Sequence, residues 1–168
     1  MIHPRVETWR SRKRSPYRVL LPLWLAMWVI VGFATAPWRH LTLYSTDIMW
    51  IPAAILFAIG FWLYRVSSRG FSARQLGGIP ELHTNDFEQR LATHGIRARI
   101  RHPVYLAHLM EMLAWSLGTG LAVCYLLTAF AILTGIFMIR AEEQELVKRF
   151  GEPYLRYQRA VPALIPRF

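Results

Sequence analysis

A basic segment in the second half of the chain stands directly before a proline. It reads Arg101-His102-Pro103-Val104-Tyr105, and proline favours the first turn of a helix because its φ angle is already helical. Free N–H groups at a helix N-terminus attract anions. With Arg101 and His102 beside them, these groups could bind a carboxylate or a phosphate. The alternative is that these residues only contact lipid headgroups at the cytoplasmic end of a membrane helix.

A polar stripe follows inside an apolar run. It consists of Tyr105, His108, Glu111 with Met112, and Trp115, whose spacing of three and four residues places them on one helix face. Ionisable groups at membrane depth are costly against lipid. We therefore expect His108 and Glu111 to face another helix or a hydrated cavity, either as catalytic groups or as a buried structural pair. The pair has too few ligands for a metal site, and we predict none.

Two adjacent carboxylates, Glu142 and Glu143, lie further along the chain. The apolar stripe that includes Ile139 and Leu146 continues through this segment, and both glutamates share its face. This pattern indicates ligand-binding groups rather than a solvated helix surface, which is the alternative. Gly151 is expected to end the helix, and the aromatic tail that contains Tyr154 is expected to be ordered.

Composition indicates which elements must position these groups. The 168 residues are 54% hydrophobic and 14% aromatic, with a formal net charge of +10. Long uncharged runs separate the basic residues, which favours anionic lipid headgroups over nucleic acid as a partner. Cys124 is the single cysteine, so neither an intrachain disulfide nor a cysteine metal cluster can form. The composition predicts an integral membrane protein, with the chain from 1 to 168 as a single membrane domain.

The apolar runs predict an all-α fold with about four membrane spans. These runs cover residues 19–38, 48–64, 103–118 and 121–139. Twenty helical residues reach roughly 30 Å, the thickness of the hydrocarbon core. The run from Pro103 to Ile139 is too long for one span, and Gly118-Thr119-Gly120 near its middle can form the turn of a helical hairpin.

The basic residues predict the orientation of the spans. Six precede the first span, one lies between the first and second, seven lie in the connector 65–102, and six follow the fourth span. Basic segments stay on the cytoplasmic side, so both termini, the connector and the segment 140–168 are expected there. Within the connector, Asn85 with Glu88 resembles a capping box, which predicts a short helix ending near His94 before Gly95.

The chemistry-bearing residues together resemble a known family. The Arg-His-Pro-Val-Tyr segment 101–105, Glu142-Glu143, Phe150-Gly151, Tyr154, Tyr157, Val161-Pro162 and Pro166 resemble the isoprenylcysteine carboxyl methyltransferase and phospholipid methyltransferase superfamily. The resemblance covers roughly residues 92–168. It implies an S-adenosylmethionine site at the cytoplasmic face, lined by Arg101, His102, Tyr105, Glu142, Glu143 and Tyr154. A glycine element that binds the cofactor in phospholipid methyltransferases could correspond to Gly118-Thr119-Gly120, although a turn on the far side of the membrane fits this segment better.

The resemblance implies methyl transfer to a hydrophobic, membrane-resident acceptor such as a lipid or a prenylcysteine. His108 and Glu111 are the candidates for deprotonating an amine or thiol, whereas a carboxylate acceptor needs no base. Ala107 stands where the family usually has glycine. The stretch 113–117 also resembles membrane sterol reductases, which bind NADPH. A reductase or a non-enzymatic membrane scaffold is therefore the alternative to a methyltransferase.

Overall fold

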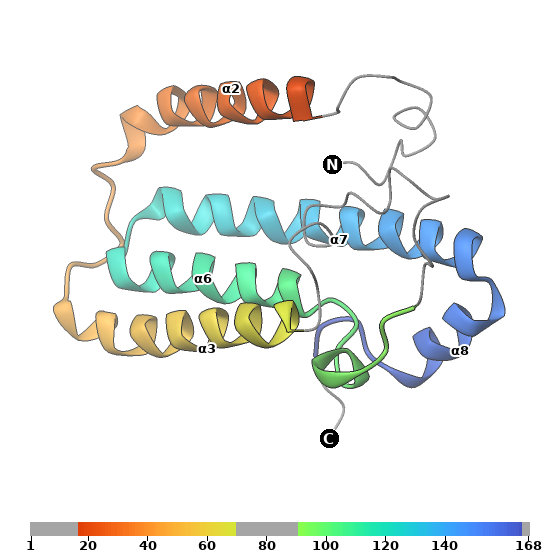
Figure 1. Ribbon diagram of the computed structural model, residues 1–168. Coiled ribbons are helices and arrows are strands. Elements are labelled where there is room, and N and C mark those ends of the chain that lie inside the picture. The colour runs from red at the N-terminus through yellow and green to blue at the C-terminus, as the bar shows by residue number, and fades with distance from the viewer. Residues whose placement is uncertain (1–16, 70–90, 166–168) are drawn as a thin grey trace. The chain divides into compact units, whose positions relative to one another are not determined.

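The computed structural model describes residues 17–69 and 91–165. Within these ranges it contains five α-helices, which are α2 (Tyr17–Thr35), α3 (Trp50–Ser68), α6 (Pro103–Thr119), α7 (Ala122–Phe150) and α8 (Glu152–Ala160) (Figure 1). Short 3-10 turns cover Ala36–Trp38, Asp47–Met49 and Gly95–Ala98. The all-α prediction is confirmed for the described residues.

Two segments are long and apolar enough to cross a membrane, Asp47–Ser68 and Ala122–Phe150. The stretch Leu25–Trp38 is apolar but shorter. The four predicted spans coincide in order with α2, α3, α6 and α7. Four crossings therefore stay a prediction, whereas two candidate spans are observed within the described residues.

Two boundaries differ from expectation. Helix α3 continues to Ser68, beyond the predicted end at residue 64. Helix α7 runs without interruption from the apolar segment to Phe150 and ends directly before Gly151, as expected. The predicted helix ending near His94 is wrong at that end, because residues 91–94 are not helical. Gly95, with φ of 63°, begins a 3-10 turn instead of closing a helix. Asn85 and Glu88 lie outside the described residues.

The chain divides into two units, and α3, α6, α7 and α8 belong to the one formed by Trp38–Arg69 and Ala92–Phe168. Helix α6 lies between α3 and α7 (Figure 1). Small residues allow α3 and α6 to pack closely, as is common between membrane helices. Ala53 on α3 and Ala107 and Ala114 on α6 are fully buried. A buried hydrogen bond of 2.9 Å joins Ser116 on α6 to Thr128 on α7.

The predicted helical hairpin is confirmed at Gly120. This residue caps α6 with φ of 64°, a left-handed conformation that glycine adopts without steric cost. The loop before α3 forms two backbone hydrogen bonds with this turn. The Leu43 N–H donates to the Gly120 carbonyl at 2.8 Å, and the Ala122 N–H donates to the Leu41 carbonyl at 2.9 Å. A Cβ at position 120 would lie 2.3 Å from the carbonyl oxygen of Tyr44, so this glycine also permits a close approach.

Replacement of Gly118 by alanine tests the packing of α6 on α3. A Cβ there would lie 2.6 Å from two ring carbons of Trp50, so we expect a loss of about 1–3 kcal/mol in the free energy of unfolding. Gly135→Ala is the matched control, because no atom lies within 4 Å of its Cβ position. Alanine favours the helix there by roughly 1 kcal/mol. Thermal unfolding in detergent measures both, and equal melting temperatures would contradict this packing.

Candidate functional site

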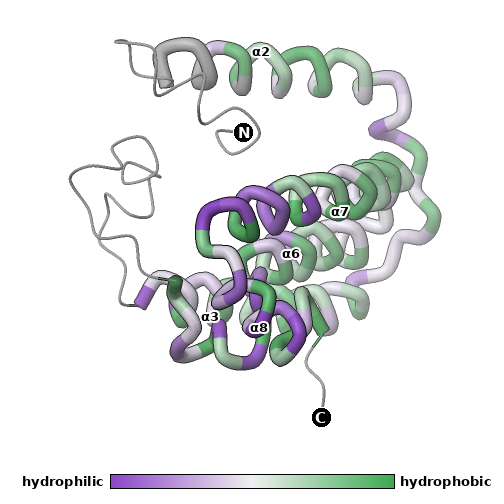
Figure 2. Tube along the Cα trace, turned by 90° about the vertical axis from the view of Figure 1, so that its right-hand side faces the viewer, coloured by the Kyte–Doolittle hydropathy of each residue, from purple (hydrophilic) through white to green (hydrophobic). Residues whose placement is uncertain are grey.

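The polar end of α7 is joined to the start of α6 by the C-terminal segment. Figure 2 shows hydrophilic residues gathered at the end of α7 and on α8. Gly151, with φ of 62°, separates the two helices as predicted. Beyond α8 the chain returns to the start of α6, where the Arg101 N–H donates to the Pro162 carbonyl at 2.9 Å and the His102 N–H donates to Ala163 at 3.0 Å.

The Arg101 guanidinium binds protein groups on three sides. Its Nε and Nη2 donate to Oε1 of Glu143 at 2.8 and 2.6 Å. Its Nη1 donates to the Gln158 carbonyl at 2.8 Å and also to the Val161 carbonyl. The Arg101 side chain is only 9% exposed. Arg101 therefore fastens α7 to α8 and to the segment that follows α8.

His102 lies between the two carboxylates. Its Nε2 is 3.0 Å from Oε1 of Glu143, and its Nδ1 is 3.7 Å from Oε2 of Glu142. Glu143 also accepts a 2.9 Å hydrogen bond from the Gln158 amide. Burial by itself raises the pKa of Glu143, but the hydrogen bonds from Arg101, His102 and Gln158 outweigh burial and lower it. Glu143 is therefore an anion at neutral pH, and its charge is already balanced.

Glu142 is the more accessible carboxylate. Its side chain is 24% exposed, against 14% for Glu143. Within the described residues its ion pairing is confined to the long contact with His102. Burial raises the pKa of Tyr105 to about 12, and the nearby charge of Glu142 adds to this effect. Glu142 consequently has hydrogen-bonding capacity that Glu143 has already used.

Tyr154 presents a buried hydroxyl to the same group of residues. The residue is 1% exposed, and within the described residues its hydroxyl has no hydrogen-bond partner. Burial raises the pKa of Tyr154, with the nearby Glu143 adding to the effect, so the hydroxyl keeps its proton at neutral pH. A buried polar group without a partner is costly, and a ligand or a water molecule could satisfy it.

Three residues of the polar stripe on α6, which are His108, Glu111 and Trp115, have their neighbours on α3, whereas Tyr105 lies toward α7. Tyr105 interacts with Glu142, as above. The Cγ of Glu111 lies 3.0 Å from the Cβ position of Gly60 on α3, so Glu111 faces another helix as expected. His108 is exposed, with its Nε2 3.4 Å from the Tyr64 hydroxyl. Trp115 is 54% exposed beside Trp50 and Phe57.

The structure thus brings six of the predicted residues together and leaves two apart. Arg101, His102, Tyr105, Glu142, Glu143 and Tyr154 form one group, which we call the polar cluster. Among the described residues, no group of three or more metal-binding side chains was found. The sequence analysis missed Gln158, although its position one helical turn after Tyr154 could have indicated it.

A membrane-type helical unit with this polar cluster matches a known family. The phospholipid methyltransferase family model matches residues 48–153, more than half of the chain. The chain belongs to this family. It is a membrane protein of the superfamily that includes the isoprenylcysteine methyltransferases.

Individual relatives are more distant. The chain is 36% identical over 85 residues to protein-S-isoprenylcysteine O-methyltransferase of Homo sapiens, covering 45% of this chain and 27% of that protein. It is 28% identical over 168 residues to methanethiol S-methyltransferase of Crocosphaera subtropica, covering 94% and 62%. It is 29% identical over 147 residues to a Delta(14)-sterol reductase of Mus musculus, covering 79% and 34%. The chain therefore spans less than two thirds of the length of each of these relatives.

Proposed function

We propose that the protein is an S-adenosylmethionine-dependent membrane methyltransferase that acts on a hydrophobic acceptor. The observation that carries the proposal is the convergence of Arg101, His102, Tyr105, Glu142, Glu143 and Tyr154 in one polar cluster. Membership of a family of methyltransferases supports it.

The accessible part of the cluster fits the methyl donor. S-adenosylmethionine supplies a methyl group bound to a positively charged sulfur, and it also carries an ammonium group. Glu142 can pair with a cation, and the aromatic face of Tyr105 suits one as well. The buried Tyr154 hydroxyl has no partner among the described residues, so it can hydrogen-bond a polar atom of the donor.

This assignment changes the role of Arg101. The sequence suggested that Arg101 and His102 hold the carboxylate of the donor, but the Arg101 guanidinium is occupied by Glu143 and two carbonyl groups. We therefore assign Arg101, His102 and Glu143 to positioning, and Glu142, Tyr105 and Tyr154 to direct contact with the donor. Methyl transfer is a displacement in which correct alignment accounts for much of the rate, so a rigid cluster serves the reaction.

The acceptor is proposed to approach from the bilayer along α3 and α6. Two polar groups lie in these otherwise apolar helices. They are Glu111, which lies against Gly60, and His108, which lies beside Tyr64. Either group can hold or deprotonate the acceptor. Glu111→Gln is therefore expected to lower turnover about 100-fold, the usual order for loss of a positioned acid or base, while donor affinity stays unchanged.

Methyl transfer from labelled donor into a total lipid extract and into a small prenylcysteine analogue measures this prediction, and it also tests the proposed function. Donor affinity and the melting temperature of the same variant are the controls. A lower melting temperature with full turnover in the folded fraction would show that Glu111 serves packing only. Donor binding without transfer to either acceptor would contradict a hydrophobic acceptor.

We also propose four membrane crossings with both termini in the cytoplasm, supported by the distribution of basic residues. With Cys124 replaced by alanine, a cysteine at Ser45 is expected to react only from outside the membrane. A cysteine at Arg156, an exposed position of α8, is expected to react only from inside. Labelling of intact and opened cells with a membrane-impermeant reagent measures both, and outside labelling at position 156 would refute the hairpin orientation.

One observation favours a second candidate function. The similarity to the Delta(14)-sterol reductase covers 79% of this chain, which lies between the 45% for the human methyltransferase and the 94% for methanethiol S-methyltransferase. An NADPH-dependent lipid reductase is therefore the alternative, and ligand binding separates the two.

A further inference from the structure

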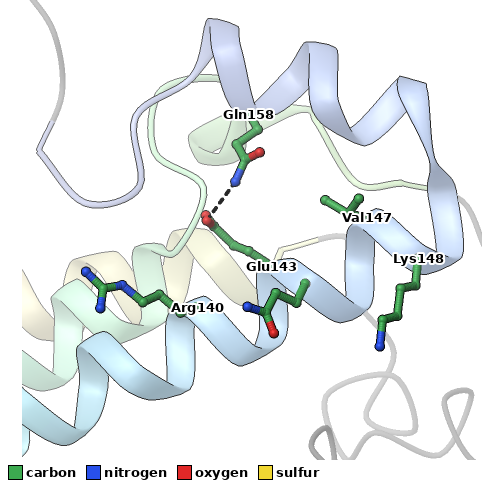
Figure 3. Close-up of a pocket in the computed structure, with 6 residues that line it drawn as sticks. Arg140, Glu143, Val147, Lys148 and Gln158 are labelled. Atoms are coloured by element: carbon green, nitrogen blue, oxygen red, sulfur yellow. Dashed lines mark hydrogen bonds between the residues drawn. The ribbon is translucent and has the colours of Figure 1, made fainter.

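A groove between α7 and α8 lies beside the polar cluster. Its volume is about 490 Å³, within the usual range for ligand sites. The lining residues are Arg140, Glu143, Gln144, Val147, Lys148 and Gln158. Figure 3 shows Glu143 bonded to Gln158 from α8, with Arg140 and Lys148 on α7 to either side.

The groove carries a net positive charge. Its single carboxylate, Glu143, is already paired with Arg101 and His102. Among the described residues, neither Arg140 nor Lys148 forms an ion pair. These two cations are eight residues apart, or roughly 12 Å along the helix, so the positive charge extends along the groove.

The groove is separate from the contacts proposed for the donor. Successive residues of a helix point about 100° apart, so Glu142 and Glu143 project in different directions from α7. Glu142 pairs with His102 at 3.7 Å and does not line the groove, whereas Arg140, Gln144 and Lys148 do. The groove therefore has positive charge that the proposed methyl transfer does not use.

The position of the groove suggests the source of the anion. Arg140 directly follows the apolar part of α7, which ends at Ile139. A basic side chain just beyond an apolar membrane segment lies at the depth of the lipid headgroups. The groove also offers amide donors from Gln144 and Gln158 beside the two cations. This set of cations and hydrogen-bond donors suits a phosphate diester.

We infer that this groove binds the headgroup of an anionic phospholipid, with the positive charges of Arg140 and Lys148 attracting the phosphate. The site differs from general attraction to a charged membrane, because it depends on two particular side chains in a cavity. It does not depend on methyltransferase activity.

Thermal unfolding of the purified full chain, titrated with short-chain phosphatidylglycerol, tests the inference. Binding to the folded state raises the melting temperature. Phosphatidylcholine with the same chains should produce a much smaller rise. Arg140→Gln and Lys148→Gln should each raise the apparent dissociation constant for phosphatidylglycerol about fivefold. Arg156→Gln is the control of equal charge, because Arg156 is exposed on α8 outside the groove, and it should leave that constant unchanged.

Three results would overturn the inference. An equal loss in Arg156→Gln would mean that surface charge, and not the groove, attracts the lipid. Equal protection by inorganic phosphate would mean that the groove binds free phosphate without a lipid. Displacement of phosphatidylglycerol by S-adenosylhomocysteine from wild type, but not from Arg140→Gln, would assign the groove to the methyl donor.

Discussion

Arg101→Gln is expected to destabilise the protein strongly, by about 3–5 kcal/mol, the usual cost of removing one partner from a buried ion pair. The substitution would leave Glu143, whose side chain is 14% exposed, without its guanidinium partner. It would also release the carbonyl groups of Gln158 and Val161. The melting temperature should fall by roughly 6–20 °C.

Two variants make this prediction sharp. Arg101→Lys keeps the charge but lacks the forked geometry of the guanidinium. Its melting temperature should therefore lie between those of Arg101→Gln and wild type. Arg156→Gln removes an exposed arginine from α8 and should leave the melting temperature unchanged. If Arg101→Gln unfolds like wild type and loses only donor affinity, then Arg101 binds the donor, as the sequence first suggested.

The second large effect is a difference between two neighbouring glutamates. Glu142→Gln should lower the affinity for S-adenosylhomocysteine about 10- to 100-fold, the usual range for a hydrogen bond to a charged group, and leave the melting temperature unchanged. Glu143→Gln should lower the melting temperature, because Glu143 accepts from Arg101 and Gln158. Calorimetric titration and thermal unfolding of both variants measure the contrast.

The reverse pattern would contradict the assigned roles. In that pattern, Glu143→Gln would lose donor affinity at an unchanged melting temperature, and Glu142→Gln would keep donor affinity but melt at a lower temperature. The donor would then contact Glu143. Unchanged affinity in both variants would show that neither carboxylate binds the donor.

Much of the helical framework could be predicted from the sequence because it depends on local properties. Apolar runs locate α2, α3, α6 and α7, and Gly120 in a left-handed conformation explains the hairpin turn. The membership of the polar cluster was also predictable, since the resemblance to the family named its residues. Spacing in the sequence could not show which of them pair with each other. The pairing of Arg101 with Glu143 depends on the return of the chain after α8, which brings Pro162 beside residue 101.

The polar stripe shows a second limit of sequence patterns. A spacing of three or four residues places side chains on the same face of a helix. It does not show which of the two helices beside α6 each side chain contacts. Glu111 thus contacts α3, while Tyr105 interacts with Glu142 on α7. Helix α8 was also missed, because its nine residues form an amphipathic segment too short for a membrane-span pattern.

Ligand-dependent thermal stability of the wild-type protein tests the proposed methyltransferase function most directly. At a concentration 100 times its dissociation constant, S-adenosylhomocysteine should stabilise the fold by about 2.7 kcal/mol, or roughly 5–10 °C in melting temperature. NADPH should produce no shift. Stabilisation by NADPH and not by S-adenosylhomocysteine would instead support a reductase, and the absence of any shift with either compound would contradict a donor site in the polar cluster.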